Sequence, residues 1–280
     1  MNVFSRSSFA GLLLLFTGCA STANNNFNSL LWMQTSAEYR ANTVQAYNEA
    51  LRNIDAAVRD RSWTAALEQP GGCQELPPAV VMDIDETVLD NSPYMGKIVL
   101  ENREWSTASW DEWVARKEAG SVPGAMDFIN AVQKKGVRVI LISNRACSKR
   151  DGSDEPCPQE ADTIDNLRKA GMEDVRPENV LLAGEQPGWI SEKKSRREAV
   201  AKRNRIVMLF GDDLGDFLSG VKTGITPEQR EQLVDLHRQR WGKKWYLLPN
   251  PTYGSWMSVL GDPKSWYIRS YGSGSPAGSR

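Results

Sequence analysis

Apolar runs rich in Val, Ile, Leu and Met recur along the chain, and segments with a helical pattern separate several of them. The first four runs are nearly continuous in β-branched and aliphatic residues, as strands buried on both faces of a sheet are. The runs lie at residues 79–85, 137–144, 179–185, 205–213 and 243–250. Residues 125–136 and 161–171 have a helical pattern, and both segments end in Gly. This alternation predicts an α/β fold with a parallel sheet flanked by helices, in which functional sites lie beyond the C-terminal ends of the strands.

An amphipathic helix is predicted ahead of the first strand. Its apolar positions recur at steps of three and four residues, namely Val44, Tyr47, Leu51, Ile54 and Val58. The sequence TSAE at 35–38 is a capping-box pattern and predicts that the helix begins there. The Pro- and Gly-containing segment 68–78 ends the pattern.

The first residues of the chain have the pattern of an export signal. The apolar run FAGLLLLFTGC ends at Cys19 and is too short to span a bilayer. FTGCA is similar to the bacterial lipobox, in which the cysteine becomes the lipidated first residue, although Phe16 stands where Leu is usual. We therefore expect a signal peptide at 1–18 and a lipidated tether at 19–34, the alternative being an ordinary cleaved signal with an incidental cysteine. Ala20 after the cysteine favours the outer membrane, so the expected location is the bacterial envelope, with membrane contact by the lipid anchor only.

Composition and charge exclude several classes of function. The formal net charge is −1, so no bulk field favours a nucleic-acid polymer as a partner. His237 is the one histidine of the chain, which rules out the two-histidine centres of most zinc hydrolases. It lies in a helix-like stretch without a motif, so we expect a surface or helix-flanking position rather than a catalytic one.

Export implies an oxidising compartment, which gives the remaining cysteines structural meaning. Cys147 and Cys157 flank a polar, loop-like segment and form a plausible disulfide. Cys73 is then left over as a free thiol, although the sequence alone leaves the pairing open.

Polar clusters follow the predicted strands, where a parallel sheet brings strand ends together. Asp83 and Asp85 lie in the sequence DIDET after the first run. The other members are Ser143 and Asn144 after the second run, Asp212 and Asp216 after the fourth, and Lys193 and Lys194 before it. Crowded carboxylates repel one another and are costly to desolvate unless a cation neutralises them. Oxygen-rich acidic sites select hard ions, so Mg²⁺ is the expected cofactor.

Simpler interpretations of these clusters exist. Acids after a strand can cap a helix or lie in a solvated turn, and Ser143 with Asn144 can form a plain turn. The two lysines can belong to the solvated face of EKKSRREAVAKR. Each simple interpretation is about as good as the functional one for a single cluster. Several such clusters after successive strands favour a phosphoryl-transfer site.

The motifs DIDET, SNR, a following lysine and GDDLGDF resemble, in this order, the four motifs of the haloacid dehalogenase (HAD) superfamily of phosphotransferases. More narrowly, DIDETVLDNSPY, SWDEWV, VPGAMDF, ISNR, GDDLGDF and LPNPTYGSW are similar to motifs of the class C bacterial acid phosphatases. The resemblance covers nearly the whole mature chain. It implies a HAD-like Rossmannoid domain over residues 35–271, and the segment after Asp85 up to Val122 is the place for a small helical cap. The Gly- and Ser-rich end, 272–280, is expected to be a flexible tail.

The resemblance also implies roles for single positions. Asp83 would be the nucleophile and a metal ligand. Asp85 would be the general acid and base, with its backbone carbonyl on the metal. Ser143 and Asn144 would bind the phosphate that is transferred.

The lysine and the remaining metal ligands follow in the same way. Lys194 is preferred over Lys193 as the phosphate-binding lysine, because a serine follows it as in the family's KS pair. Asp212 would ligate Mg²⁺ directly, and Asp216 would support it. Asp213 stands where the family often has Asn, so its role stays open.

Aromatic residues are candidates for contact with the leaving group. In the resembled family an aromatic pair at the positions of Trp110 and Tyr253 sandwiches a base or another flat group, and stacking of this kind contributes about 1–3 kcal/mol per base. The alternative is that these side chains belong to the core, as internal tryptophans usually do.

These features together predict Mg²⁺-dependent hydrolysis of phosphate monoesters, 5′-nucleotides and small aryl or alkyl phosphates, through an aspartyl-phosphate intermediate. An acidic pH optimum is implied by the family. One alternative is another HAD activity, although dehalogenases lack the second acid that Asp85 supplies. The other is a non-enzymatic, nucleotide-binding surface lipoprotein, which would bind its ligand whether or not Asp83 is present.

Overall fold

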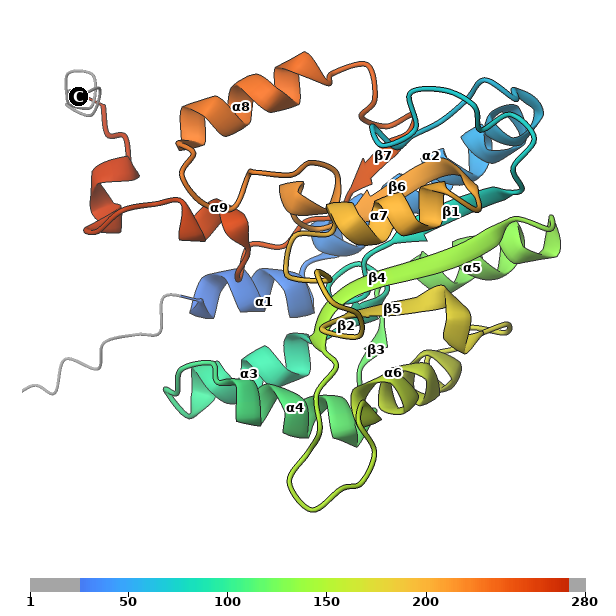
Figure 1. Cartoon of the computed structure of the whole chain (residues 1–280). Helices are drawn as coiled ribbons and strands as arrows, with labels where there is room; N and C mark the ends of the chain where they lie inside the picture. The colour runs from blue at the N-terminus through green and yellow to red at the C-terminus, as the bar shows by residue number, and fades with distance from the viewer. Residues whose placement is uncertain (1–25, 272–280) are drawn as a thin grey trace, which may run out of the picture.

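The computed structural model describes residues 26–271 (Figure 1). Its centre is a five-stranded parallel sheet with the strand order β5–β4–β1–β6–β7. The strands are β1 (Pro78–Met82), β4 (Arg138–Ala146), β5 (Val180–Ala183), β6 (Arg205–Gly211) and β7 (Trp245–Leu247). Each coincides with one of the five apolar runs to within a few residues, and the predicted parallel α/β fold is confirmed.

Helices cover both faces of this sheet. The helices of the described chain are α1 (Phe27–Thr35), α2 (Ala37–Arg59), α3 (Ser92–Leu100), α4 (Thr107–Arg116), α5 (Ala125–Lys134), α6 (Pro158–Lys169), α7 (Lys194–Ala201), α8 (Pro227–Leu236) and α9 (Ser255–Ser258). Helices α2 and α5 pack against each other and against the central strands on one face, and α7 lies against β6 on the other (Figure 1). The helices predicted at 125–136 and 161–171 are α5 and α6.

Two hydrophobic cores lie on the opposite faces of the sheet. Along β1, Val80 and Met82 belong to the core beneath α2 and α5, whereas Ala79 and Val81 belong to the core beneath α7. Successive side chains of a strand point to opposite faces, so burial on both faces requires a continuous apolar run. The sequence pattern that predicted the strands is therefore a direct consequence of the two cores.

The described part of the chain begins with two consecutive helices rather than one. Leu30 and Met33 of α1 are buried, so the chain is helical and packed from Phe27 onwards. The tether predicted at 19–34 is therefore too long at its C-terminal end. The signal peptide, Cys19 and the tail at 272–280 lie outside the described residues.

The N-cap of α2 lies one residue after the position that the sequence predicted. Ser36, not Thr35, is the N-cap of α2, and its hydroxyl accepts a hydrogen bond from the amide of Tyr39 over 3.0 Å. The Thr35 hydroxyl donates instead to the carbonyl of Leu31 within α1.

A small helical cap follows the first strand, at the position that the sequence indicated. It contains α3 and α4, and two short antiparallel strands, β2 (Leu89–Asp90) and β3 (Gly120–Ser121), enclose it. After β7 the chain continues through α9 and a 3₁₀ turn at Lys264–Tyr267, which projects from the body of the protein (Figure 1). No helix within residues 26–271 is long and apolar enough to cross a membrane.

Candidate active site

The strand register places the ends of β1, β4 and β6 side by side. Met82, the last residue of β1, pairs with Leu141 of β4 and with Phe210 of β6. The amide of Asp83 continues this pairing and donates to the carbonyl of Phe210 over 3.0 Å. Polar residues that are distant in sequence but follow these strands therefore meet at one edge of the sheet.

Three carboxylates form a cluster at this edge. One oxygen from each of Asp83, Asp212 and Asp216 lies within 4.8 Å of the other two. Gly211 makes this approach possible, because a Cβ at that position would lie 2.1 Å from Oδ2 of Asp216. The structure thus brings together three of the four predicted metal ligands. The fourth, Asp85, was predicted to bind the metal through its backbone carbonyl, and its side chain lies outside the cluster.

The donor set of this cluster fits a hard divalent cation such as Mg²⁺. Asp212 is oriented by the Thr87 hydroxyl at 3.2 Å and by the Asn250 amide at 2.9 Å. Between residues 26 and 271 no lysine or arginine forms an ion pair with Asp212. Burial, followed by the charges of Asp83 and Asp216, raises the pKa of Asp212 well above its ordinary value. The ionised carboxylates are therefore unfavourable here without a cation, and a bound divalent cation would stabilise them.

Lys193, not Lys194, enters this cluster. Its Nζ lies 2.5 Å from Oδ1 of Asp83 and 2.6 Å from Oδ1 of Asp216, and its side chain is 4% exposed. The side chain of Lys194 is 57% exposed, and its Nζ lies 3.7 Å from Glu198. The preference for Lys194 as the phosphate-binding lysine is therefore corrected. Neighbouring residues in a helical segment point in different directions, and Lys193 is the one that faces the strand ends.

The charges of Asp83 and Lys193 depend on each other. Burial raises the pKa of Asp83 to about 6; the Lys193 ammonium opposes this rise, and Asp216 and Asp85 add to it. Burial alone would lower the pKa of Lys193, but attraction to Asp216 and Asp83 outweighs it and raises that pKa above its ordinary value. Lys193 is therefore a permanent positive charge beside the candidate nucleophile.

Asp85 is held on the side of the site that faces the cap. Its Oδ1 accepts from Arg145 Nη2 at 2.8 Å, from Arg145 Nε at 3.0 Å and from Asn91 Nδ2 at 2.9 Å. Its Oδ2 accepts from the Ser143 hydroxyl at 3.1 Å. Asn91 is fixed in turn by the indole N–H of Trp113, which donates to its Oδ1 over 2.8 Å. Charge-assisted bonds of this kind fix the direction in which a carboxylate points.

Ser143 and Asn144 reach the site from β4. The hydroxyl of Ser143 donates to Asp85 and accepts from the amide of Arg145 over 3.0 Å. Both hydrogen bonds are therefore made with residues of the site itself. Asn144 is exposed, and its Oδ1 accepts from Nη2 of the buried Arg196 over 2.7 Å. The Arg196 guanidinium therefore fixes the amide oxygen of Asn144 and leaves its N–H groups for other partners.

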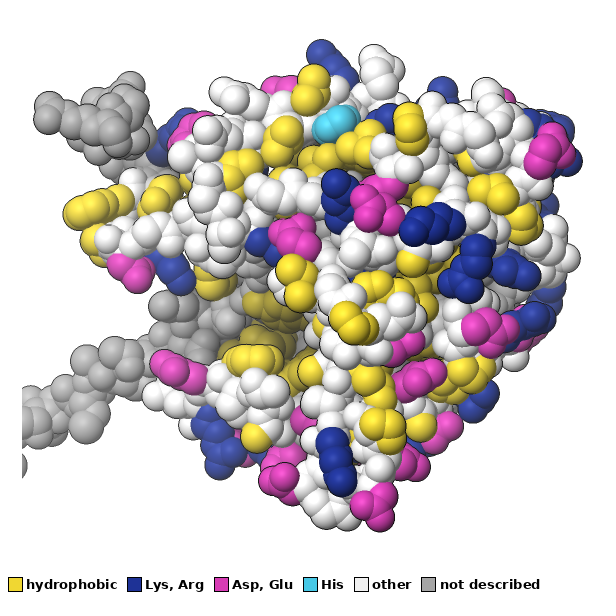
Figure 2. Space-filling model, in the orientation of Figure 1, with side chains coloured by type: hydrophobic (Ala, Val, Ile, Leu, Met, Phe, Trp, Pro, Cys, Tyr) yellow, Lys and Arg dark blue, Asp and Glu magenta, His cyan; other side chains and the backbone are white. Residues whose placement is uncertain are grey.

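Trp110 and Tyr253 come from two elements that are distant in sequence. Trp110, on α4, meets Tyr94 edge-on with ring centroids 5.1 Å apart, and the Arg145 guanidinium lies 5.9 Å from its ring centroid. Tyr253 lies in the segment after β7, and both aromatic side chains are half-buried against the same core. Figure 2 shows a hollow between the surface over α9 and the surface over α3 and α4.

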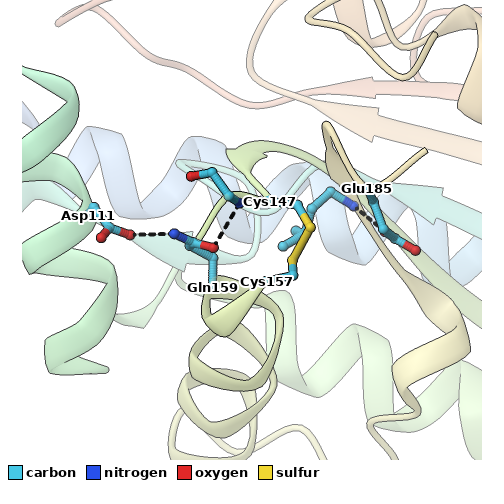
Figure 3. The surroundings of a disulfide bond; sticks show 7 residues. Asp111, Cys147, Cys157, Gln159 and Glu185 are labelled. Carbon is cyan, nitrogen blue, oxygen red and sulfur yellow. Dashed lines mark hydrogen bonds between the residues drawn. A yellow bond between two sulfur atoms is a disulfide. The ribbon is translucent and has the colours of Figure 1, made fainter. Parts of the chain in front are cut away.

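A disulfide between Cys147 and Cys157 closes the loop after β4 (Figure 3). Gln159, just beyond the second cysteine, donates to Oδ1 of Asp111 over 3.0 Å. Asp111 lies on α4 next to Trp110. The closed loop is therefore joined to the helix that carries the candidate aromatic contact.

Cys73 is a free thiol and His237 flanks a helix, as the sequence indicated. Cys73 is buried and free. His237 is the C-cap of α8, and its ring packs 5.0 Å from that of Trp245. Burial lowers the pKa of His237, with Arg240 acting in the same direction.

Sequence reasoning missed the residues that orient the predicted ones. They are Asn91 and Arg145 around Asp85, Arg196 behind Asn144, and Asn250 beside Asp212. Arg145 and Asn250 lie inside the motifs ISNR and LPNPTYGSW, and that membership is the signal that could have found them. Glu86, next to Asp85, was missed as well: it is buried and has a φ of 56°, a strained conformation of the kind that clusters at functional sites.

Known proteins resemble most of the chain in sequence and in fold. The family model of the HAD superfamily, subfamily IIIB (acid phosphatase), matches residues 16–256. The chain is similar to the class C acid phosphatase from Bacillus anthracis with tungstate bound, with 31% identity, a TM-score of 0.68, and coverage of 89% of this chain and 90% of that chain. A second structure of the Bacillus anthracis enzyme gives 32% identity, a TM-score of 0.67, and coverage of 88% and 90%.

Curated relatives match over a shorter region. The stem 28 kDa glycoprotein of Glycine max is 29% identical over 178 residues, which cover 62% of this chain and 58% of that protein. Acid phosphatase 1 of Solanum lycopersicum is 27% identical over 141 residues, which cover 49% of this chain and 51% of that protein. The chain thus spans about half the length of the curated relatives it matches.

Proposed function

Because the chain belongs to subfamily IIIB of the HAD superfamily, the acid phosphatases, we propose that it hydrolyses phosphate monoesters through a phosphoryl group carried by Asp83. The observation that carries this proposal is the position of Asp83. It follows the central strand, lies among Asp212 and Asp216, and has the Lys193 ammonium 2.5 Å away. A carboxylate in these surroundings is suited to attack the phosphorus of a negatively charged ester.

The reaction proceeds in two displacements. In the first, an oxygen of Asp83 attacks phosphorus, the bond from Asp83 to phosphorus forms and the ester P–O bond breaks. Asp85 gives its proton to the leaving oxygen. In the second, Asp85 takes a proton from a water molecule whose oxygen attacks phosphorus. The bond to Asp83 then breaks and inorganic phosphate leaves.

The surrounding residues supply charge and position. Lys193, Ser143 and Asn144 bind the phosphoryl oxygens, on which negative charge is spread in the transition state. Arg145 and Asn91 keep the Asp85 carboxyl at the side from which the leaving group departs. Mg²⁺, held by Asp83, Asp212, Asp216 and the backbone carbonyl of Asp85, would neutralise the crowded carboxylates and the phosphate when bound.

We propose nucleoside 5′-monophosphates, beside small aryl and alkyl phosphates, as the substrate class. Trp110 and Tyr253 approach the site from the cap and from the segment after β7, which supports a flat leaving group between them. Smaller esters need the phosphate site alone.

Phosphate release by the purified chain tests the activity. A nucleoside 5′-monophosphate and p-nitrophenyl phosphate are assayed with Mg²⁺ and with EDTA, for the wild type, Asp83→Asn and the exposed control Asp174→Asn. Turnover that requires Asp83 and the metal, and survives in the control, supports the aspartyl-phosphate route. Nucleotide binding that is equally tight in Asp83→Asn, without phosphate release by the wild type, favours the binding lipoprotein instead.

For the location, we propose a lipid anchor at Cys19 that holds the protein at the bacterial outer membrane. The support is the FTGCA sequence and the Ala20 that follows the cysteine. Metabolic labelling with palmitate is expected to mark the wild type and to leave Cys19→Ser unlabelled. Equal labelling of both would contradict the anchor.

A further inference from the structure

The segment Asn250–Ser255, which we call the aromatic loop, carries Tyr253 and is tied at both ends to consecutive aspartates. One end meets Asp212 and the other meets Asp213. Asp212 belongs to the carboxylate cluster, whereas Asp213 has no part in the proposed chemistry. The role that the sequence left open for Asp213 can be derived from these contacts.

The first end of the loop is built on Asn250. Its amide nitrogen donates to Oδ2 of Asp212 over 2.9 Å. Its Oδ1 accepts from the Thr252 amide at 3.0 Å, the Thr252 hydroxyl at 2.7 Å and the Tyr253 amide at 3.4 Å. One side chain therefore fixes the backbone on the N-terminal side of Tyr253 relative to the cluster.

The second end is built on Asp213 and Ser255. Oδ2 of Asp213 accepts from the Ser255 amide over 2.5 Å, and Oδ1 accepts from the Ser255 hydroxyl and from the Gly215 amide, each over 2.7 Å. Gly254 has a φ of 137°, and a Cβ there would lie 3.0 Å from Oδ2 of Asp213. The close approach of the loop to this carboxylate thus depends on a glycine.

The Ser255 hydroxyl is held from a second direction. Nη1 of the buried Arg230 donates to it over 2.8 Å, while the hydroxyl itself donates to Asp213. Asp213 thus accepts three hydrogen bonds, two of them from Ser255.

We propose that Asp213 and Ser255 form a latch that fixes Tyr253 against the leaving group, so that the two residues determine specificity for flat leaving groups without touching substrate. This inference rests on the proposed function, in which Tyr253 contacts the leaving group. A loop pinned at both ends presents the tyrosine ring in one orientation. A loop free at one end must lose conformational entropy each time a flat group binds. A phosphate ester without a flat group gains nothing from the latch.

The latch is tested with Ser255→Ala, which removes the hydroxyl and keeps the Ser255 amide bond to Asp213. Ser258→Ala, in the same short helix α9, is the matched control, because its hydroxyl bonds only backbone carbonyls, those of Lys222 and Ser255, within the described chain. KM and kcat are measured on a nucleoside 5′-monophosphate and on glycerol phosphate. Ser255→Ala is expected to raise the nucleotide KM about five- to tenfold, as loss of about one hydrogen bond implies, with glycerol phosphate kinetics unchanged. Asp213→Asn, which keeps one acceptor oxygen, is expected to raise the nucleotide KM as well.

A double-mutant cycle with Tyr253→Ala identifies the route of the effect. If the latch acts through the tyrosine, Ser255→Ala adds nothing to the nucleotide KM in the Tyr253→Ala background. Additive effects, or equal changes on both substrates, would overturn the inference. Thermal unfolding of each variant shows whether it is folded.

Direct binding separates this inference from the proposed function. Calorimetric titration of the nucleotide into the wild type and Ser255→Ala, each in the Asp83→Asn background, measures affinity without turnover. Affinity weakened by Ser255→Ala supports the latch even if no ester is hydrolysed, and unchanged affinity contradicts it. A wild type that hydrolyses neither ester contradicts the proposed function alone.

Discussion

Lys193 and Asp83 form a buried ion pair, with Nζ 2.5 Å from Oδ1 and side chains that are 4% and 11% exposed. In the proposed reaction the lysine charge therefore lies where negative charge grows during phosphoryl transfer. Lys193→Met is expected to lower kcat about 10²- to 10³-fold on nucleotide and small ester alike, as loss of a group that stabilises transition-state charge does. Steady-state kinetics with saturating Mg²⁺ measure this.

Lys194→Met is the matched control for that change. The side chain is exposed and lies 3.7 Å from Glu198 on its own helix, so kcat and KM are expected to stay within about twofold of wild type. A large loss of kcat in Lys194→Met, together with near-wild-type kcat in Lys193→Met, would contradict this prediction. It would support Lys194 as the phosphate-binding lysine, as the KS pair suggested.

The misplaced lysine shows why parts of the site could not be predicted. One face of α7 and its N-cap is buried at helical spacing, and its members are Lys193, Arg196, Arg197 and Val200. Three of these four residues are basic, so the stripe resembles a solvated surface rather than a core face. What buries them is contact with groups distant in sequence, such as the 2.7 Å pair between Arg197 and Glu68. A single sequence does not show such pairs.

The strands and the carboxylate cluster were predictable for a physical reason. Burial on both faces forces the strands to be continuously apolar, and a parallel sheet forces the residues after them to one edge. Helix α1 was missed because its start follows a polar stretch and its buried positions, Leu30 and Met33, are few. The residues that orient the site, such as Asn91 and Asn250, act through hydrogen bonds that leave no periodic pattern.

Stability in the absence of metal is expected to depend on the charge of Asp83. Its pKa is raised to about 6 in the folded protein, from an ordinary value of 3.8, with burial as the largest cause. Between these two values the folded state binds more protons than the unfolded state, so this group's contribution to the free energy of unfolding falls as pH rises through that window. The loss amounts to about 2–3 kcal/mol.

Denaturant unfolding in EDTA at pH 4.5 and pH 6.5 measures this effect, and Asp83→Asn isolates it from other carboxylates. The stability of Asp83→Asn relative to wild type is expected to increase from the lower to the higher pH. For the same reason, added Mg²⁺ is expected to stabilise the wild type more at pH 7 than at pH 5. A relative stability that does not change with pH would contradict the shifted pKa.

Loss of Trp110 is expected to raise KM for nucleotides more than for small esters. Trp110→Ala removes a ring that packs edge-on against Tyr94, and a stacked base would lose about 1–3 kcal/mol of contact. KM for a nucleoside 5′-monophosphate is therefore expected to rise about tenfold or more, with little change for glycerol phosphate. Trp105→Ala, at a 56% exposed position just before α4, is the control. Equal losses on both esters in Trp110→Ala would indicate a core residue instead.

The disulfide between Cys147 and Cys157 is expected to stabilise the fold and to hold the cap. It closes a loop with a sequence separation of 10 residues, for which the chain-entropy account gives about 2–3 kcal/mol. Arg150, inside that loop, binds Asp111 of α4 through Nε at 2.6 Å and Nη2 at 2.9 Å. Without the disulfide, the loop must lose conformational entropy to keep the bonds between Arg150 and Asp111. These bonds then form less favourably, and α4 with its Trp110 is held less firmly.

Dithiothreitol is therefore expected to lower the free energy of unfolding of the wild type by about this amount. It is also expected to raise KM for the nucleotide more than for glycerol phosphate, because in the proposed binding mode only the nucleotide contacts the Trp110 ring that α4 carries. The double variant Cys147→Ser with Cys157→Ser should start from the reduced values and show no response to the reductant, since the remaining thiol in the described chain, Cys73, is buried and unpaired. Asp111→Asn should reproduce the effect on KM while keeping most of the stability, because the disulfide remains closed. A response of the double variant to dithiothreitol, or an unchanged nucleotide KM in Asp111→Asn, would show that the loop does not support α4.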